Sequence, residues 1–476
     1  MDLVRRPAFR ITLAGAIAVV WALGGPLGPA APAHASSAAG GTQLWLSRFN
    51  GLGNGDDDPG GLGASPDGST VFVTGTGPGS TGFYGWDTVA YDAKTGAKRW
   101  ITQYNGVGAG STDGLALSPD GSKVFVTGES FGPSFDSVDY TTVAYDSLTG
   151  NQLWLSQYDG PSHQNDFPVA INVSADGNTV FVAGESGGGC CFDYATVAYD
   201  AATGTQRWAA RYDGQLNKND IAVALAVSPG GASVFVTGYS DNSHDYWDYA
   251  TVAYDASTGT QRWARRYKGQ DNNGGSPEAL TVSPGGGTVY VTGLGVGSTS
   301  GTDFATVAYN TSTGATRWIA RYNGPGNGDD AAKAISVSPG GSSVFVTGWS
   351  TRPGTGTDYA TVAYSASTGA QQWVGRYTGP GADTDIALAI AVSPGGRRVF
   401  VTGESSGTGT GDDYATVAYS VSTGATLWSM RYDGPAHDSD IANAMVISPG
   451  GRKVFVTGLS TGSGTGLDYA TIAYSA

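Results

Sequence analysis

The chain has 476 residues, with 40 acidic and 25 basic side chains and a formal net charge of −15 at pH 7. This acidity argues against a nucleic acid or an anionic membrane as the partner, because both carry negative charge themselves. The chain has two cysteines, Cys190 and Cys191, and because they are neighbours they cannot form a scaffold of disulfides between distant segments.

Residues 1–35 have the pattern of a secretory signal peptide. Arg5 and Arg6 precede an apolar stretch, residues 11–23, and Ala33, His34 and Ala35 provide a small-residue cleavage site. The stretch is too short to span a membrane, and no second apolar run follows it. The sequence therefore predicts a secreted, extracellular protein whose mature part, residues 36–476, is one domain.

Eight tryptophans recur every 54 or 55 residues along this mature part. Each closes the pattern Ala-x-Asp/Asn/Ser-x-x-Thr-Gly-x-x-x-Trp, first seen between Ala90 and Trp100. A repeat of this length is typical of stacked supersecondary units. The eight residues are Trp45, Trp100, Trp154, Trp208, Trp263, Trp318, Trp373 and Trp428.

Each repeat contains four predicted strands, called a to d. In the sixth copy they are residues 330–337, 343–348, 358–364 and 370–377, rich in β-branched and aromatic side chains and separated by Gly, Pro and Ser turns. The mature chain begins with strand d of a copy, at Gly41, and ends with the remaining strands of that copy, at Ala476. We therefore predict an all-β, eight-bladed propeller of four-stranded blades, closed by pairing the N-terminal outer strand with the three C-terminal strands.

Polar residues that recur in every copy are expected to be architectural. An Asp opens strand c in seven copies and an Arg ends strand d in six, so a cross-strand ion pair is expected. Gly85 and Gln103 replace both partners in one copy, and Gln157 replaces the Arg in another. The loops between strands d and a and between strands b and c should share one face, which is the expected functional face.

Four side chains that depart from the repeat are expected to line the central channel: Asp113, Glu278, Lys333 and Asn443. Glu278 and Lys333 lie in adjacent copies, so they either pair with each other or contact a ligand or ion at the channel mouth. Strand b also ends in unlike residues. Among these, Trp349 either packs at the rim or stacks on a sugar or another planar ligand.

The tryptophan motif resembles the eight-bladed propeller of the quinoprotein (PQQ-dependent) alcohol dehydrogenases and the wider group of PQQ-like repeat proteins. The resemblance covers residues 41–476 and implies that the eight indoles are structural, packing between blades with each N–H on a carbonyl group. The enzymes also carry a vicinal disulfide against their cofactor. The resemblance thus implies a site for PQQ and calcium beside Cys190 and Cys191, with Glu185 and Trp349 as further candidates.

The sequence also departs from these enzymes. It has almost no insertions between blades, and such insertions supply their Asp base, calcium ligands and stacking Trp. No catalytic residue can be assigned, and no Ser–His–Asp arrangement follows from spacing. In an oxidising compartment the vicinal cysteines are expected to form a disulfide.

Two metal sites are possible from residue types alone. If reduced, Cys190 and Cys191 could bind Cu or Zn together with His163 and His244, which flank them. Asp56, Asp57 and Asp58 form a candidate calcium loop, although it lacks the twelfth-position Glu of an EF-hand.

Two functions remain open. The first is a secreted, non-catalytic, monomeric propeller that presents its loop-rich face to a protein or a glycan. The second is a small quinoprotein-like oxidoreductase with PQQ and calcium near Cys190 and Cys191.

Overall fold

The computed structural model describes residues 40–51, 53–79, 84–106, 108–131, 137–242, 246–297, 301–354, 356–381 and 383–476. The predicted signal peptide and His244 lie outside these residues. The described part forms eight four-stranded antiparallel sheets and one short 3-10 turn, η1 (Gln270–Asn272). It contains no helix that is long and apolar enough to cross a membrane. The predicted eight-bladed, all-β architecture is confirmed.

The blades follow one another along the chain. The first comprises β2 (Asp58–Ala64), β3 (Thr70–Pro78), β4 (Tyr84–Asp92) and β5 (Lys98–Tyr104), and the second β6 (Thr112–Leu117), β7 (Lys123–Phe131), β8 (Val138–Asp146) and β9 (Gln152–Tyr158). The third comprises β10 (Asp166–Val173), β11 (Thr179–Gly187), β12 (Phe192–Asp200) and β13 (Gln206–Tyr212), and the fourth β14 (Asp220–Val227), β15 (Ser233–Asp241), β16 (Trp247–Asp255) and β17 (Gln261–Tyr267).

The fifth comprises β18 (Gly275–Val282), β19 (Thr288–Val296), β20 (Thr302–Asn310) and β21 (Thr316–Tyr322), and the sixth β22 (Asp330–Val337), β23 (Ser343–Arg352), β24 (Gly356–Ser365) and β25 (Gln371–Tyr377). The seventh comprises β26 (Asp385–Val392), β27 (Arg398–Ser406), β28 (Asp412–Ser420) and β29 (Thr426–Tyr432). The eighth comprises β30 (Asp440–Ile447), β31 (Lys453–Gly462), β32 (Gly466–Ser475) and β1 (Gln43–Phe49).

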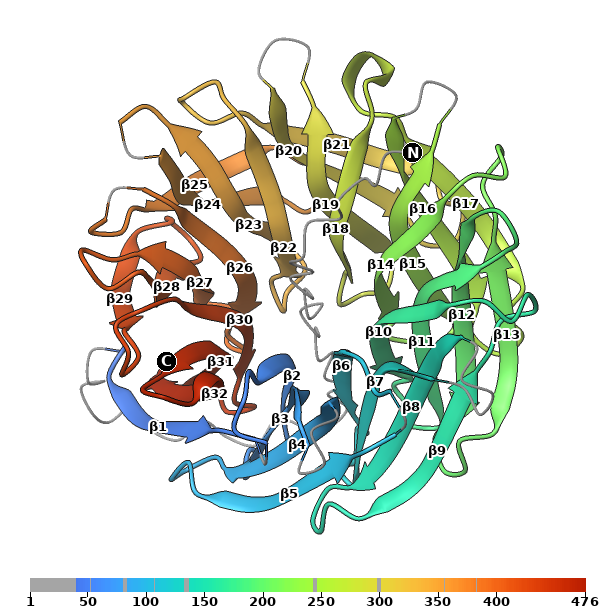
Figure 1. The fold of residues 1–476 in the computed structure, drawn as a ribbon. Coiled ribbons are helices and arrows are strands. Elements are labelled where there is room, and N and C mark those ends of the chain that lie inside the picture. The colour runs from blue at the N-terminus through green and yellow to red at the C-terminus, as the bar shows by residue number, and fades with distance from the viewer. Residues whose placement is uncertain are drawn as a thin grey trace, which may run out of the picture.

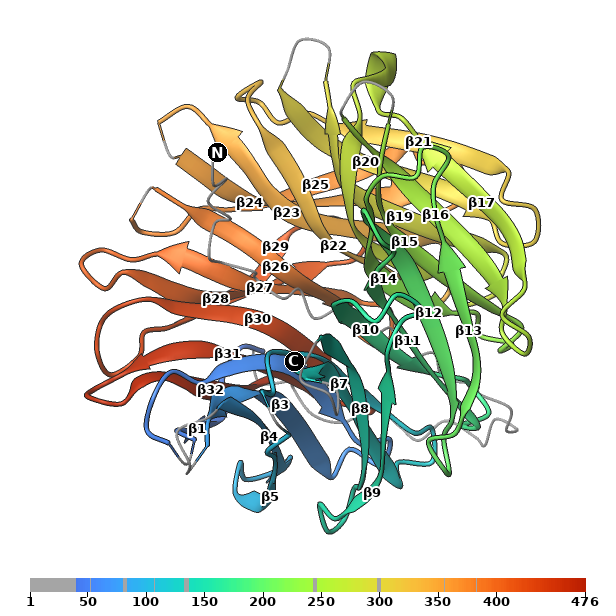
Figure 2. The same cartoon turned by 45° about the vertical axis from the view of Figure 1, so that its right-hand side comes forward.

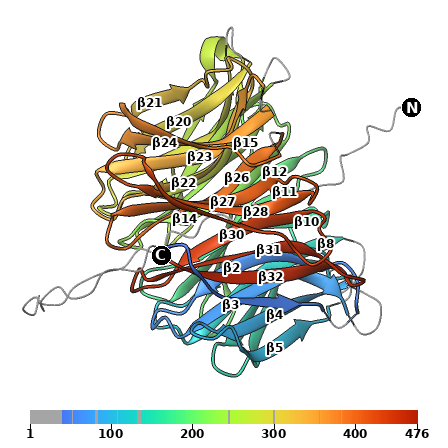
Figure 3. The ribbon, with the colours of Figure 1, turned by 90° about the vertical axis from the view of Figure 1, so that its left-hand side faces the viewer.

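The blades are arranged in a ring with strand a of each blade innermost and strand d outermost (Figure 1). Neighbouring innermost strands contact one another all the way round, including β30 of the last blade and β2 of the first. In the side view the blades that contain β23, β27, β31 and β3 follow one another in succession (Figure 3). Each blade therefore buries both faces of its sheet against its neighbours.

The two ends of the described chain meet in the eighth blade. β1 lies beside β32 and pairs with it in antiparallel register, with Phe49 opposite Tyr469 and Arg48 opposite Ala470 (Figures 1 and 2). Trp45 is opposite Ala473 in the same ladder. The N-terminal strand is thus the outer strand of the C-terminal blade, so that blade leaves no unpaired inner edge.

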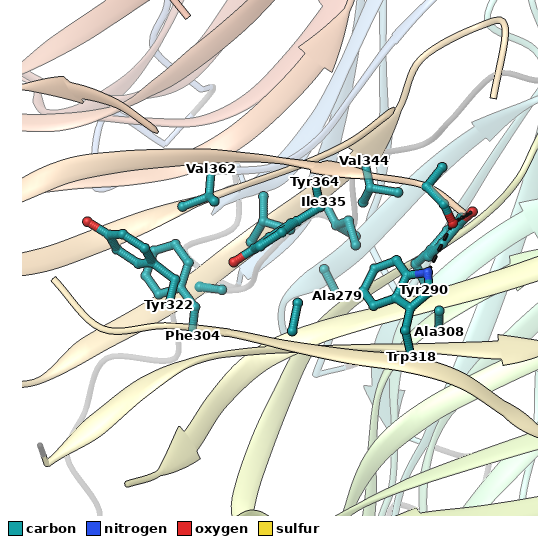
Figure 4. Packing of buried hydrophobic residues seen from close by; sticks show 14 of the residues in the cluster. Ala279, Tyr290, Phe304, Ala308, Trp318, Tyr322, Ile335, Val344, Val362 and Tyr364 are labelled. Carbon is teal, nitrogen blue, oxygen red and sulfur yellow. Dashed lines mark hydrogen bonds between the residues drawn. The ribbon is translucent and has the colours of Figure 1, made fainter. Parts of the chain in front are cut away.

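The tryptophan motif joins each blade to the next. In Figure 4, Trp318 of the fifth blade packs beside Tyr290, with the ring centroids 5.6 Å apart, and its indole N–H donates to Ala366 O of the sixth blade at 3.0 Å. Gly369 lies against the indole, and a Cβ there would come within 2.7 Å of it. Gly369 also has a φ of 72°, so glycine suits this position on both grounds.

The same hydrogen bond recurs for seven of the eight motif tryptophans, as the resemblance implied. The exception is Trp428, whose Nε1 has no partner within the described residues. Trp428 lies against Gly40 and Gly41 at the start of the described chain.

Candidate functional site

The regular blades share a polar network on the face that carries the loops between strands b and c and between blades. In the fifth blade, Arg321 Nη2 contacts Asp303 Oδ2 at 2.9 Å and donates to Gly295 O. The expected ion pair is confirmed in five blades, as Arg48–Asp468, Arg211–Asp193, Arg266–Asp248, Arg321–Asp303 and Arg431–Asp413. In these blades a guanidinium group neutralises the carboxylate that opens strand c.

The first blade lacks this network. Gly85 and Gln103 replace the Asp and the Arg, and Gly77 stands where six other blades have a serine. Asp87 takes a position that is Ala or Thr in the other blades, and its side chain is 0% exposed. A Cβ at Gly77 would lie 1.9 Å from Asp57 Oδ1, so a serine side chain has no room here. The first blade has therefore exchanged a salt bridge for a buried carboxyl group.

Asp57 and Asp87 border the same buried space. A Cβ at Gly51 would lie 2.4 Å from Asp57 Oδ1 and 3.1 Å from Asp87 Oδ2. Asp57 Oδ2 accepts a hydrogen bond from Gly51 N at 2.6 Å, whereas Asp57 Oδ1 and both oxygens of Asp87 are without a hydrogen-bond donor in the part of the chain that the structure describes. Burial and the charge of Asp57 raise the pKa of Asp87 to about 7, and burial raises the pKa of Asp57 to about 6. Both carboxyl groups therefore hold a proton at higher pH than an ordinary aspartate does.

A pocket of about 430 Å³ opens beside this pair. Asp57 stands between Asp56 and Asp58, which both line the pocket. Trp86, fully buried, donates from its indole N–H to Gly110 O at 3.0 Å and so holds the next blade's loop against the first blade. The lining residues come from the eighth blade, the first blade and the connection to the second, and they are Asp56, Asp58, Thr76, Tyr84, Ala109, Gly110, Ser111 and Leu467.

The pocket lies on the face that was expected to be functional, and exposed aromatic side chains gather on that face. Tyr84 is 52% exposed, and Trp247 is half exposed and stacks on Tyr239 with the ring centroids 4.6 Å apart. Among the described residues, the exposed aromatic side chains all flank loops between strands b and c, and they are Tyr84, Phe131, Tyr246 and Trp247. Exposed aromatic rings with carboxylates and hydroxyl groups between them are typical of recognition surfaces.

The three residues of the candidate calcium loop point to different partners. Asp56 Oδ1 accepts a hydrogen bond from Leu467 N at 3.0 Å, which ties the first blade to the eighth. Asp57 is buried beside Asp87, and Asp58 faces the pocket. The three carboxylates therefore do not converge on one point.

The four candidate channel residues each occupy the bulged position of an innermost strand. The ladder skips Asp113, Glu278, Lys333 and Asn443, and a bulge redirects the skipped side chain. Lys333 Nζ contacts Glu278 Oε1 at 2.8 Å, and Asn443 Nδ2 donates to Pro59 O at 2.7 Å. Asp113 is buried near Ser111. Three of these residues thus link adjacent blades, and for Glu278 and Lys333 this pairing is the structural alternative raised above.

The expected vicinal disulfide is wrong for this structure. Cys190 and Cys191 are free thiols, and their sulfur atoms lie 3.7 and 3.5 Å from Asn217 O. Both S–H groups thereby find an acceptor without closing the strained eight-membered ring that a disulfide would form. The neighbouring Cys190 thiol and burial raise the pKa of Cys191 to about 11, which disfavours the thiolate that binds metals.

The candidate cofactor residues come from two different blades. Cys190, Cys191 and Glu185 belong to the third blade, and Glu185 is buried, while Trp349 is a half-buried residue of the sixth blade. None of them lines the pocket of the first blade. These residues thus lie three blades apart around the ring, and their assignment to one site for PQQ and calcium stays a prediction.

His163 has a different partner from the one suggested by sequence. Its Nδ1 lies 2.5 Å from Asp159 Oδ2, and this hydrogen bond raises the pKa of His163. Among the described residues, the groups of three or more side chains close enough to share a metal ion consist of aspartates alone. The structure thus does not bring His163 together with the two cysteines.

Several known proteins share this architecture. Sqt1 from Chaetomium thermophilum, in a structure bound to the N-terminus of the ribosomal protein L10, is 13% identical with a TM-score of 0.59, and the match covers 91% of this chain and all of that one. Quinohemoprotein alcohol dehydrogenase from Comamonas testosteroni is 14% identical with a TM-score of 0.54, and the match covers 91% of this chain and 76% of that one. Such identities show the fold alone. No curated protein matches the chain.

A family model matches residues 33–291 and 248–471, which together make up most of the chain. This match agrees with the eight-bladed fold and with the tryptophan motif on which the PQQ-like repeat resemblance was based. The chain therefore belongs to the family of PQQ-like repeat propellers that is described as outer membrane protein assembly factor BamB.

Proposed function

We propose that this chain is a secreted, non-catalytic propeller that recognises a protein segment through the pocket of its first blade. The proposal rests on the position of the pocket in the ring. The pocket lies at the one blade in which both partners of the repeated Asp–Arg pair are replaced. Residues that every blade shares are explained by their role in the fold. A blade that lacks a stabilising network found in the other blades is therefore expected to have a function of its own.

The chemistry of the pocket favours a basic partner. Asp56 and Asp58 supply carboxylates, Thr76 and Ser111 supply hydroxyl groups, and the Tyr84 ring offers a face for a cation or an apolar side chain. The net charge of −15 would also attract a basic partner from a distance. The Sqt1 structure shows that a propeller of this architecture can hold a protein segment.

An array that carries basic peptides, acidic peptides and glycans on one surface tests this function. We expect wild-type protein to bind basic peptides, and Tyr84→Ala and Asp58→Asn variants to lose that binding. Tyr246→Ala is the matched control, because Tyr246 is an equally exposed aromatic residue of the fourth blade. Binding that survives both pocket variants would contradict the assignment of the site, and binding confined to glycans would contradict the choice of ligand.

The oxidoreductase alternative has its own test. PQQ and Ca²⁺ are added to the purified protein, the visible spectrum is recorded, and dye reduction is followed with alcohols and sugars. We expect neither a bound-quinone spectrum nor dye reduction. Saturable reduction that requires both additions would contradict the non-catalytic proposal.

A further inference from the structure

We propose that Cys190, Cys191 and the main-chain carbonyl group of Asn217 form a binding site for Zn²⁺ at the third blade. The two cysteines belong to the loop between β11 and β12, and Asn217 belongs to the connection that leads to the fourth blade. Thiolate ligands favour Zn²⁺ over the harder ions Mg²⁺ and Ca²⁺. The site lies apart from the pocket of the first blade, so the proposal does not depend on the proposed function.

Three possible ligand atoms lie together in this site. Cys190 Sγ is 3.7 Å from Asn217 O, and Cys191 Sγ is 3.5 Å from the same oxygen. The two thiols also form a side-chain hydrogen bond with each other. In a tetrahedral zinc site a sulfur ligand and an oxygen ligand lie about 3.6 Å apart, because Zn–S distances are about 2.3 Å and Zn–O distances about 2.1 Å. Both sulfur–oxygen distances therefore match a tetrahedral zinc site.

Hydrogen bonds hold the cysteine loop in place. Gly188 N donates to Cys191 O at 2.7 Å and closes a turn that contains both cysteines. Phe192 N donates to Asn219 Oδ1 at 3.1 Å, which attaches the end of the loop to the connection that contains Asn217. The sulfur atoms and the carbonyl group are therefore positioned before an ion binds, as a metal site requires.

Comparison of the blades shows which part of the site is special to the third blade. Asn217 has a φ of 50°, and Asn327, at the same place in the connection to the sixth blade, has a φ of 49°. This backbone conformation is thus a feature of the repeat. The chain has no cysteines other than Cys190 and Cys191. The third blade has therefore added two thiols beside a connection whose shape it shares with another blade.

The surroundings favour a cation and leave a ligand position open. Asp241 and Asp193, of which Asp193 is paired with Arg211, act electrostatically on the Cys191 thiol, and negative charge attracts a metal ion. Cys190 is exposed and Cys191 half-buried, so water has access to the fourth ligand position. Zinc displaces the thiol protons when it binds, so the raised pKa of Cys191 lowers the affinity without removing the ligand.

Cobalt and zinc titrations of the full chain test the proposal, with a phosphine reductant present to keep the thiols reduced. Co²⁺ is the probe, because it replaces Zn²⁺ in thiolate sites and then shows thiolate-to-cobalt charge-transfer absorption. We expect one Co²⁺ per chain with this absorption, and its displacement by Zn²⁺. Cys190→Ser and Cys191→Ser should lose the absorption and bind Zn²⁺ about 10-fold or more weakly, because loss of even an outer-shell partner of a metal site has an effect of that size.

Substitution of Asn217 tests the carbonyl ligand separately. Asn217→Gly keeps the left-handed backbone and should bind Zn²⁺ as wild type does. Asn217→Val disfavours that conformation, so it should turn the carbonyl group away and weaken binding about 10-fold. Asn327→Val is the matched control, because it makes the same change in a connection without cysteines beside it, and it should bind as wild type does.

The proposal is overturned if reduced wild type shows no thiolate-to-cobalt absorption, or if the two cysteine variants bind Zn²⁺ with unchanged affinity. Equal affinity of Asn217→Gly and Asn217→Val would overturn the three-ligand site. Peptide binding at the first blade should persist in Cys190→Ser, so failure of the zinc proposal and failure of the proposed function are distinguishable.

Discussion

Asp87 and Asp57 lie on two sides of one buried space in the first blade, and three of their carboxylate oxygens accept no hydrogen bond from any described residue. In the regular blades an arginine and a serine occupy the corresponding region, as Arg266 and Ser240 do with an Nη1 to Oγ distance of 2.8 Å. The first blade has replaced a neutralised network by a pair of acids beside a pocket. The stability of the folded protein should therefore depend on pH through this pair of carboxyl groups.

The carboxyl pair should make folding less favourable as the pH rises. The folded pKa values, about 7 for Asp87 and about 6 for Asp57, lie above the ordinary value near 3.9 of an unfolded Asp. The folded state therefore holds protons that the unfolded state releases. Its stability from this source is complete below about pH 4 and declines as the pH rises through 6 and 7.

Asp87→Asn should remove most of this dependence. At pH 8 the variant should unfold with a free energy greater than that of wild type by on the order of 2 kcal/mol, and at pH 4 the two should be similar. Urea unfolding at both pH values checks this, with the exposed Asp438→Asn as the control. Parallel pH profiles for wild type and Asp87→Asn would contradict the assignment of the raised pKa.

The indole hydrogen bonds between blades can be tested within one molecule. Trp318 donates to Ala366 O, whereas Trp428 has no partner within the described residues. Trp318→Phe should therefore destabilise the protein by about 1 kcal/mol more than Trp428→Phe, which is the contribution of one hydrogen bond. Thermal unfolding of the two variants side by side measures the difference. Equal losses would show that packing alone accounts for the motif.

Pairing of β1 with β32 should be necessary for a monomeric ring. Deleting residues 41–49 removes β1 and leaves the outer edge of β32 unpaired. We expect the deleted protein to aggregate or to melt at a much lower temperature, because an exposed strand edge pairs with other chains. Size-exclusion chromatography and thermal unfolding report the outcome, with a chain that begins at Gly40 as the control. A monomer with an unchanged melting temperature would rule out a structural role for closure.

The fold could be predicted from the sequence because the tryptophan and Thr-Gly positions repeat the same contact in successive blades. Trp318 on Gly369 is one example, and its spacing is visible without coordinates. Gly85 and Gln103 were also recognisable as joint departures from the repeat. Asp87 was not, because its burial depends on Gly51 and Gly77, which come close to it only in the folded blade.

The arrangement of other candidate site residues also depends on the folded chain. Asp56, Asp57 and Asp58 are consecutive, but side chains of a nearly extended segment alternate in direction, so a run of carboxylates does not make a cage. The cluster of three aspartates that contains Asp139 is instead assembled from residues up to 27 positions apart on two blades. For Asp56, Asp57 and Asp58, closeness in the sequence was misleading. For the cluster at Asp139, comparison of equivalent positions in successive blades would have been informative.

Calorimetric titration of the strongest basic peptide from the array into wild type, Tyr84→Ala and Tyr246→Ala tests the central claim most directly. Removal of the Tyr84 ring should weaken binding about 10-fold or more, as loss of an aromatic residue at the centre of an interface does, while the melting temperature stays unchanged. Tyr246→Ala should bind as wild type does. Equal affinity of all three proteins would contradict the claim that the pocket of the first blade is the recognition site.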